Sequence, residues 1–492
     1  MTMRAEFDPA AARPPQIAER MQDVAFAICV GFAAAAIYFA NGSALLNDPD
    51  TFWHITVGRD IASNWHFPTV DSYSHTETGQ PWIAKEWLSQ LILFAAHALG
   101  GWHGVVAITG TAIAASGALL AGYLRPILGR TGATIACLLA IFIMASSMLA
   151  RPHVLVMPVI ALWTVLLARR ADRAEPPPFI ALPLMLLWTN MHASFAMGPI
   201  LVAGFGAIAV SASAPDRQSR LLLQWGGFLA GTAALTLVTP YGAEAALLPF
   251  RMMGSGVGTE FIQEWLPLRA EGLGLVAMML AVAMAAALAC RPLANAPRLA
   301  LSAFVTFQML KHARFVLLFA VIAPVVSARA CREGFERVRA RFGLFRGPDP
   351  LDAVRNWAVP ALAAILLCAT LAVLLPPVPR AAVRPDAALA AAGPLAAERV
   401  YNDYDFGGFL IERGIRTFVD GRTDQLFNRG FRHRIEAALD AADPSAFGAL
   451  LDATGVSWAL VRPSDREANQ LSRLPGWRRI HVDAVAAVFA RS

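Results

Sequence analysis

The stretch that decides the fold is LLNDPDTFWHITVGRDI, residues 45–61, which places charge directly after a long apolar segment. It contains three aspartates, a histidine and an arginine. The preceding residues, 23–44, are apolar and long enough for a membrane-spanning helix, which needs roughly 20 residues. Ionisable side chains beside lipid are costly unless they have a partner or a function. We therefore interpret the stretch as the start of a functional loop at a membrane surface.

The composition of the whole chain agrees with a membrane protein. Hydrophobic residues make up 57% of the sequence and charged residues only 15%, whereas soluble proteins have about 25% charged residues. Long apolar runs recur from residue 23 to residue 376, which predicts a mainly α, polytopic membrane protein. No small-residue cleavage site follows a short apolar core near the start, so we expect a signal-anchor and not a cleaved signal peptide.

The apolar runs predict eleven spans with short connections. One difficult region, 297–328, has Lys311, His312 and Arg314 in its middle, and a break at LKHARF is more favourable than three cationic groups in lipid. The predicted spans are 23–44, 103–124, 131–149, 154–169, 176–190, 195–213, 221–239, 271–290, 297–310, 315–328 and 357–376.

Basic residues set the predicted orientation. Arginines gather in alternate short loops, which by the positive-inside rule face the cytoplasm. This topology leaves all ten histidines and both lysines on the opposite face. We expect a protein of the bacterial inner membrane whose outer face carries the function. Arginines in short clusters between apolar runs do not favour nucleic-acid binding.

The predicted organisation has four parts. Residues 1–22 form a cytoplasmic tail, and 23–376 form the membrane domain, whose first outer loop, 45–102, holds amphipathic helices near 50–63 and 85–99. An Ala/Pro-rich linker, 377–398, leads to a periplasmic α/β domain, 399–492. In that domain TFVDGR, SWALVR and AVAAVFARS are strand-like, whereas FRHRIEAALDAA and PSAFGALLDATG are helix-like.

The acidic pair of the first loop has two interpretations. Asp48 followed by Pro49 is a favourable helix start, with Asp48 as the N-cap. A cap requires one aspartate, however, and here Asp50 lies on the same helix face as His54, four residues later. A carboxylate at this position suits a general base that takes a proton from an attacking hydroxyl.

Further candidates lie in the other outer loops. Glu86 in AKEWLSQ and Glu264 in QEWLP each precede a tryptophan, and each glutamate either caps a helix or serves the site. The adjacent Trp87 and Trp265 are most simply interfacial anchors. Asn190 and His192 in LWTNMHASF lie in a tight hairpin. These two residues either orient a sugar hydroxyl or carboxylate, or cap the turn.

Cations also converge on the outer ends of the spans. Arg151, His153, Lys311, His312 and Arg314 suit a phosphate or pyrophosphate. Each of them alone is explained equally well by snorkelling to lipid headgroups.

A divalent metal is possible but has no diagnostic spacing. Asp48, Asp50, His54, Glu86 and His192 offer suitable ligands, yet no His-Glu-x-x-His pattern occurs. The five cysteines show no Cys-x-x-Cys spacing, so we predict neither a disulfide nor a thiolate zinc site.

The motifs DPDTFWHITVGRDI, PWIAKEWLSQ, LWTNMHASFAMG, TPYG and YNDYDFGGFLI…TFVDGR, with the predicted architecture, resemble the GT-C superfamily of integral-membrane glycosyltransferases. This superfamily includes protein O-mannosyltransferases and the aminoarabinose transferase of lipid A. The resemblance implies a polyprenyl-phosphate-linked sugar donor, a glycan, lipid or protein acceptor, and inverting transfer of a hexosyl or pentosyl group at the periplasmic face.

The resemblance also implies residue roles. Asp48 is the expected base, and Asp50 is expected either to be its partner or to orient the acceptor. Arg151, Lys311 and Arg314 are the expected ligands of the donor phosphate. The relatives usually show Asp-Glu where this chain has Asp-Pro-Asp, which leaves open the choice between the two aspartates.

Two other functions use similar parts. A polysaccharide polymerase or ligase takes the same class of donor, and sequence separates it poorly from a monosaccharide transferase. A transporter for lipid-linked saccharides predicts charges at mid-membrane and repeated halves, and the sequence shows neither feature. A scaffold without activity leaves the acidic pair of the first loop without a purpose.

Overall fold

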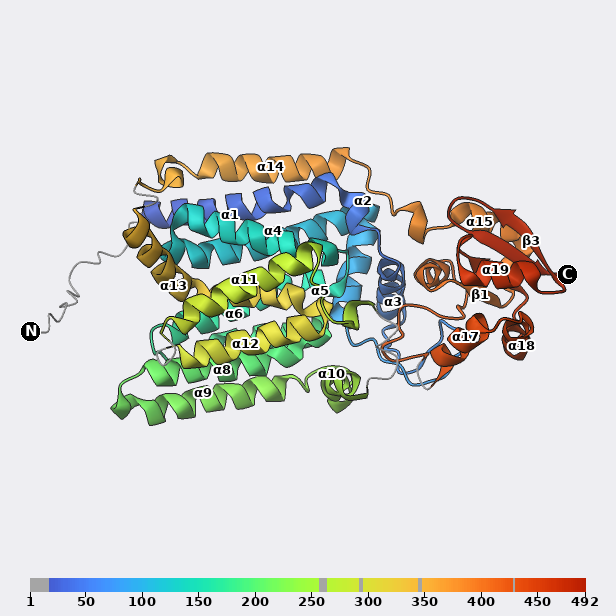
Figure 1. The fold of residues 1–492 in the computed structure, drawn as a ribbon, viewed down its shortest axis with the longest axis horizontal. Helices are drawn as coiled ribbons and strands as arrows, with labels where there is room; N and C mark the ends of the chain where they lie inside the picture. The colour runs from blue at the N-terminus through green and yellow to red at the C-terminus, as the bar shows by residue number, and fades with distance from the viewer. Residues whose placement is uncertain (1–16, 256–262, 292–294, 344–346, 428–429) are drawn as a thin grey trace, which may run out of the picture.

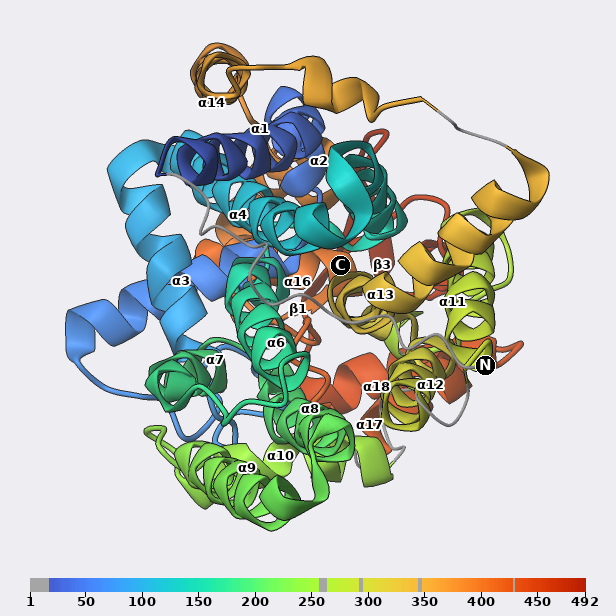
Figure 2. The same ribbon diagram turned by 90° about the vertical axis from the view of Figure 1, so that its left-hand side faces the viewer.

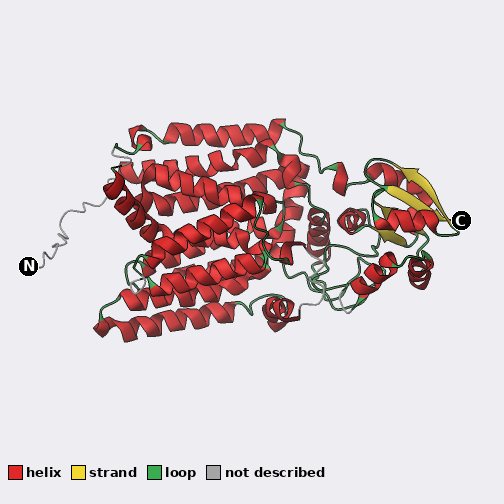
Figure 3. Ribbon diagram, in the orientation of Figure 1, coloured by secondary structure: helices red, strands yellow, loops and turns green. Residues whose placement is uncertain are grey.

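The computed structural model of the chain describes residues 17–255, 263–291, 295–343, 347–427 and 430–492. Figure 1 shows a bundle of long helices at one end of the molecule and a smaller unit, built from C-terminal residues, at the other. Every strand of the described residues belongs to the smaller unit (Figure 3). The mainly α class with a small α/β unit is therefore confirmed.

The described residues up to 374 form helices joined by loops. They are α1 (Ile17–Ala40), α2 (Gly42–Leu45), α3 (Asp50–Asn64), α4 (Trp87–Ile143), α5 (Pro152–Leu155), α6 (Met157–Ala171), α7 (Leu182–Met191), α8 (Met197–Ala212), α9 (Pro215–Leu235), α10 (Ala243–Ser255), α11 (Gly272–Ala289), α12 (Ala296–Lys311), α13 (Val316–Phe342) and α14 (Ala358–Leu374). One continuous apolar core, which includes Phe26, Trp163 and Phe319, joins the bundle.

Each predicted span overlaps a helix, and α4 contains two of them. Among the described residues, six helical segments are long and apolar enough to cross a membrane, so the number of eleven spans stays a prediction. The predicted break at LKHARF is confirmed, because α12 ends at Lys311 and α13 begins at Val316 after the short 3-10 helix η6 (Ala313–Phe315). The helix α13 runs well past residue 328, where a loop was expected, and an ion pair between Arg332 and Glu336 supports the extension.

The two amphipathic helices of the first outer loop are present. The first is α3, and the second is the opening part of α4. The helix α4 is bent at Gly101 and Gly129, whose φ values of 56° and 76° suit glycine and no other common residue. The bend at Gly101 separates the surface segment of α4 from the segment that enters the bundle.

The C-terminal unit is a mixed sheet with helices packed around it. Its strands are β1 (Val400–Asn402), β2 (Trp458–Val461), β3 (Trp477–Val482) and β4 (Ala487–Arg491), in the order β1-β2-β4-β3. Only the β1–β2 pair is parallel. The helices are α15 (Asp386–Ala392), α16 (Gly407–Glu412), α17 (Phe431–Asp440), α18 (Ser445–Thr454) and α19 (Arg466–Arg473). The helix α15 lies in the segment expected as a linker, and it packs on the sheet through Ala388 and Ala392.

One strand prediction is wrong. Residues 417–422, TFVDGR, form no strand of the sheet. Their backbone pairs instead with the first outer loop, where the Thr417 amide donates to the Tyr73 carbonyl and the His75 amide donates to the Thr417 carbonyl. Phe418 of this segment points into a core, and Asp420 joins a buried ion network.

The first outer loop and the C-terminal unit share that core. Trp53, Val57 and Trp82 of the loop pack with Phe418, Phe431 and neighbouring residues of the C-terminal unit. At its edge lies Arg422, only 1% exposed, which donates to Asp420 and to Asp71 at 2.7 and 2.5 Å. The Arg422 guanidinium also stacks over the rings of Tyr73 and Trp82, at 5.2 and 5.0 Å.

Replacing this arginine tests the attachment of the two parts. In Arg422→Met the buried carboxylates of Asp71 and Asp420 lose their counter-charge, which we expect to cost about 3–5 kcal/mol. Thermal unfolding in detergent, together with trypsin cleavage of the C-terminal unit, measures the loss. The exposed Arg416→Met is the matched control. Equal melting temperatures for the two variants would show that the network does not hold the C-terminal unit.

Candidate active site

A cavity of about 470 Å³ lies where the first outer loop, the end of the bundle and the C-terminal unit meet. Most of the residues predicted from sequence line it. They are Asp48, Asp50, His54, Glu86, Arg151, His153, His192, Glu264 and Arg314.

Arg151 is the centre of the charged cluster. Its Nε and Nη2 atoms donate to the two oxygens of Asp48 at 2.5 and 2.6 Å, a bidentate pair. Nη2 also lies 2.9 Å from Asp50 Oδ2, and Nη1 donates to Glu264 Oε1 at 2.5 Å. One guanidinium thus binds three carboxylates, which occupies most of its donors.

The local chain explains this arrangement. Arg151 has an extended backbone and precedes Pro152, the first residue of α5. Hydrogen bonds tie this segment to the first loop, since the Ala150 amide donates to the Leu45 carbonyl and the Thr51 hydroxyl to the Ala150 carbonyl. The N-cap of α3 is Pro49 and not Asp48 as predicted, but Asp48 Oδ1 still accepts from the Asp50 amide, the first amide of the helix, at 3.1 Å. Asp48 is fully buried, so it serves both helix start and arginine.

Asp50 differs from Asp48 because its side chain is 13% exposed, whereas the side chain of Asp48 is fully buried. Trp53 Nε1 donates to its Oδ1 at 3.0 Å, and Arg151 approaches its other oxygen. Burial raises the pKa of Asp50 to about 7, although Arg151 lowers this pKa and the neighbouring Asp48 raises it. Asp50 can therefore exchange a proton near neutral pH.

Glu86 faces two histidines and does not cap its helix. Its oxygens lie 4.0 Å from His54 Nε2 and 3.5 Å from His192 Nε2. The Ser194 amide donates to His192 Nδ1 at 3.1 Å, and Gln90 Nε2 lies 3.3 Å from His54 Nδ1. Each ring therefore carries its proton on Nε2 and directs it toward Glu86.

Burial reinforces this arrangement of charges. It raises the pKa of Glu86 and lowers the pKa of His54 and His192. Both imidazoles are thus neutral at physiological pH, and no lysine or arginine in the described part of the chain forms an ion pair with Glu86.

Arg314 and Lys85 also line the cavity. Arg314 stacks over Trp265 at 4.6 Å and forms no ion pair within the part of the chain that the structure describes. Lys85 pairs with Asp424 of the C-terminal unit, and burial lowers the pKa of Lys85 to about 8. Lys85 was not singled out from the sequence, although it adjoins Glu86 and is one of only two lysines.

Three predicted site residues lie outside the cavity. Lys311 is exposed at the end of α12. His312 Nδ1 lies 2.6 Å from the Trp265 carbonyl oxygen. Asn190 accepts a hydrogen bond from Trp87 Nε1 at 2.8 Å and donates to the Val238 carbonyl at 3.0 Å. These contacts support a structural role for His312 and Asn190, in which they hold the loops in place.

Their partner tryptophans are also held inside the protein. Trp87 spends its indole N–H on Asn190, and Trp265 is 9% exposed beneath Arg314. Both tryptophans thus have partners inside the protein, and the anchor role expected for them stays a prediction.

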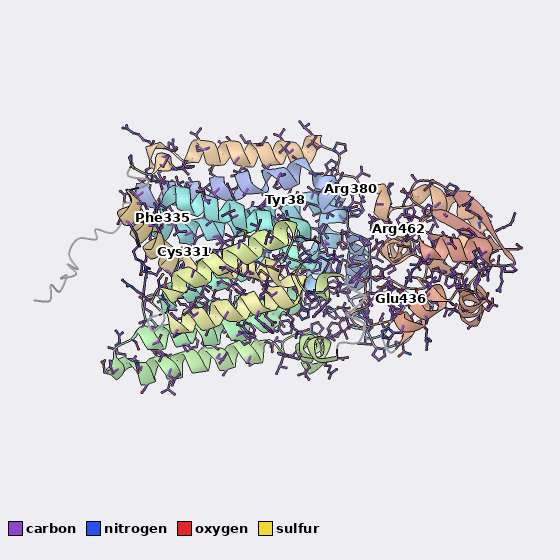
Figure 4. The ribbon with its side chains drawn as sticks, viewed as in Figure 1. Tyr38, Cys331, Phe335, Arg380, Glu436 and Arg462 are labelled. Carbon is purple, nitrogen blue, oxygen red and sulfur yellow. The ribbon has the colours of Figure 1, made fainter. Side chains whose placement is uncertain are left out.

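The C-terminal unit supplies a wall that sequence reasoning missed. Tyr404, Asp405, Gly421, Asp424 and Arg462 line the cavity, and Figure 4 labels Arg462 in this unit. The approach is close, because a Cβ atom on Gly421 would lie 1.8 Å from Asp50 Oδ1.

A second glycine shows the same closeness. A Cβ atom on Gly408 would lie 1.8 Å from the Pro49 carbonyl oxygen. The paired glycines of YNDYDFGGFLIERG, to which no chemistry was assigned, are thus explained by close packing, of Gly408 against Pro49 and of Gly407 against Asp420.

The question of a metal stays open. The described residues contain no group of three or more His, Cys, Asp or Glu side chains placed to hold a metal ion. The possible divalent metal therefore remains a prediction from sequence.

Comparison with known proteins shows the fold. No family model matches the chain, and no curated protein matches its sequence. The crystal structure of ArnT from Cupriavidus metallidurans bound to undecaprenyl phosphate is similar, with a TM-score of 0.50, 13% sequence identity and coverage of 93% of this chain and 97% of that chain. The apo structure of the same ArnT has a TM-score of 0.42 at 14% identity and the same coverage. The chain thus shares the fold of this ArnT.

The proton affinity of Asp50 is measurable. Arg151 is the main influence that lowers the pKa of Asp50, so Arg151→Gln should raise that pKa clearly above 7. Infrared difference spectra of the carboxyl band across pH 5–9, with Asp50→Asn as the reference, follow this titration. Arg314→Gln is the control, since Arg314 is not among the groups that shift Asp50. An unchanged titration in Arg151→Gln would contradict the coupling.

Proposed function

We propose that this chain is a membrane glycosyltransferase that moves a sugar from a polyprenyl-phosphate-linked donor to an acceptor hydroxyl at the periplasmic face. The observation that carries the proposal is the cavity at the end of the bundle, which is lined both by Asp50, a carboxylate with a pKa near 7, and by Arg314, an arginine that forms no ion pair among the described residues. The undecaprenyl phosphate in the similar ArnT structure supports this class of donor.

The proposed orientation follows the arginine pattern. The N-terminus lies in the cytoplasm, and the cavity with the C-terminal unit lies in the periplasm of a bacterial inner membrane. A donor anchored by its lipid tail then reaches the cavity from the outer surface of the bilayer.

We assign the donor phosphate to Arg314 and Lys85. Arg151, the first expectation, already has three carboxylates on its guanidinium, and Lys311 lies outside the cavity. Arg314 offers a planar fork of donors that fits phosphate oxygens. Lys85 lines the same cavity as Arg314, and the charge of Arg314 lowers the pKa of Lys85, so the two cations lie near each other.

We assign the general base to Asp50. It accepts the proton of the acceptor hydroxyl while the hydroxyl oxygen attacks the anomeric carbon from the side opposite the phosphate. The bond between that carbon and the phosphate oxygen breaks, polyprenyl phosphate leaves with the electron pair, and the anomeric configuration inverts. Asp48, bound through both oxygens, is a positioning residue that holds Arg151 against Asp50.

The acceptor enters from the side of the C-terminal unit. Tyr404, Asp405 and Arg462 face the cavity there, and hydroxyl and carboxylate groups of this kind bind polyhydroxylated molecules. The acceptor is a glycan, a lipid or a protein. A polymerase or ligase differs from this proposal only in its acceptor.

Replacing Asp50 separates binding from chemistry. Asp50→Asn removes the base and should lower the transfer rate by about 10²–10⁴-fold, while the donor site stays intact. Mass spectrometry of lipids that co-purify with the protein should then show the intact sugar-linked donor on Asp50→Asn and free polyprenyl phosphate on the wild type. Arg314→Gln is the control and should retain neither lipid.

Two outcomes contradict parts of this scheme. Full retention of the sugar-linked donor only in Asp48→Asn would move the base to Asp48. Ordinary phospholipid alone in every preparation would remove the support for a polyprenyl donor.

The pH dependence has a defined sign. Asp50 acts as a base only when it is deprotonated, and its pKa is about 7. The value of kcat/KM for transfer should therefore rise with pH, about tenfold per unit below pH 7, and level off above it. A rate that stays flat from pH 5 to pH 9 would exclude Asp50 as the base.

A further inference from the structure

A second cavity lies at the opposite end of the bundle, away from the C-terminal unit. Its volume is about 450 Å³, and α4, α6 and α13 surround it. Figure 2 views this end of the molecule, and Figure 4 labels Cys331 and Phe335 on the adjoining part of α13. The proposed transfer reaction makes no use of this cavity.

A buried carboxylate organises the cavity. Asp172, whose side chain is 4% exposed, accepts from Arg298 Nη2 at 2.5 Å, from Tyr123 OH at 3.0 Å and pairs with Arg329 Nε at 3.1 Å. These partners come from α12, α4 and α13, so one carboxylate connects four helices. It also fixes the direction of Arg329 at the cavity wall.

The wall has more positive than negative charge. Four arginines line it, namely Arg169, Arg173, Arg329 and Arg332, against the two carboxylates of Asp172 and Glu333. Both carboxylates already have cationic partners. Asp172 pairs with Arg298 and Arg329, and Glu333 pairs with Arg291 at 3.4 Å. The cavity therefore has a surplus of guanidinium groups that its own acids do not neutralise.

The individual pairs leave this surplus accessible. Arg173 lies 4.0 Å from its nearest carboxylate, Glu175, and Arg332 pairs with Glu336 on the outer surface of α13. Arg169 has no ion pair within the described ranges of the chain. An attraction to the C-terminal end of α6 explains Arg169 alone, but it does not explain why arginines of α13 face the same hollow.

We propose that this cavity binds a phosphate group, either the phosphodiester of an anionic phospholipid headgroup or a free phosphate. Guanidinium groups donate paired hydrogen bonds to phosphate oxygens, and arginines from two helices can hold one such group together. Ile127 and Pro126, at the bend of α4, provide an apolar edge beside the charges. Such an edge suits the glycerol and acyl carbons of a lipid.

Native mass spectrometry of the full-length protein tests the proposal. Phosphatidylglycerol and phosphatidylcholine are titrated separately into the detergent-solubilised protein, and bound lipid is counted. The test variant is Arg169→Gln/Arg332→Gln, which leaves the partners of Asp172 intact. The control is Arg217→Gln/Arg220→Gln at the start of α9, which removes the same charge at the same end of the bundle but outside the cavity.

We expect wild type and control to bind phosphatidylglycerol about tenfold more tightly than phosphatidylcholine, and the test variant to lose this preference. Displacement of the lipid by millimolar inorganic phosphate would identify free phosphate as an occupant, and resistance to displacement would identify the headgroup. Equal loss in test variant and control, or no preference in wild type, would overturn the proposal. If the double variant does not fold, Arg169→Gln alone gives the same comparison. The outcome is independent of the transfer reaction, which is assigned to the other end of the bundle.

Discussion

The structure of the outer cavity depends on one guanidinium group, that of Arg151. It joins the start of α3, the start of α5 and the short 3-10 helix η5 (Gln263–Trp265), because Asp48, Asp50 and Glu264 all bind it. Buried ions are tolerated only when they are paired and hydrogen-bonded, and here the surplus of negative charge remains on the cavity side. Burial, together with that surplus of negative charge, keeps the pKa of Asp50 at about 7. A fully neutralised aspartate would be a weak base.

The C-terminal unit is part of this site and not an appendage. It shares a core with the first outer loop, and Arg422 binds carboxylates from both. Its Gly421 lies against Asp50, where any side chain would collide. Lys85, a proposed phosphate ligand, is held by Asp424 from the same unit. The proposed base and one proposed phosphate ligand are therefore positioned by residues more than 300 places further along the chain.

The sequence predicted what depends on local patterns. Apolar runs located the helices, and the cost of buried cations located the break between α12 and α13. The sequence did not predict the directions of the side chains at that break. Arg314 lines the cavity, whereas Lys311, three residues earlier, is exposed outside it. TFVDGR was misassigned because the pattern of a strand also fits a segment that packs against a distant loop. Lys85 and Tyr404 needed knowledge of the contact between loop and C-terminal unit, which no spacing in the sequence contains.

The charges of the outer cavity place binding and catalysis in opposition. Its lining includes six carboxylates, Asp48, Asp50, Glu86, Glu264, Asp405 and Asp424, against four cations, Lys85, Arg151, Arg314 and Arg462. A donor phosphate that enters an already acidic cavity is favoured when a carboxyl takes up a proton. Glu86, whose pKa burial raises, and Asp50 are the groups placed to do so. Asp50 must then release that proton before it can accept one from the acceptor hydroxyl. On the proposed mechanism, lower pH strengthens donor binding and higher pH favours transfer, so the acidity of one cavity sets the balance between holding the donor and using it.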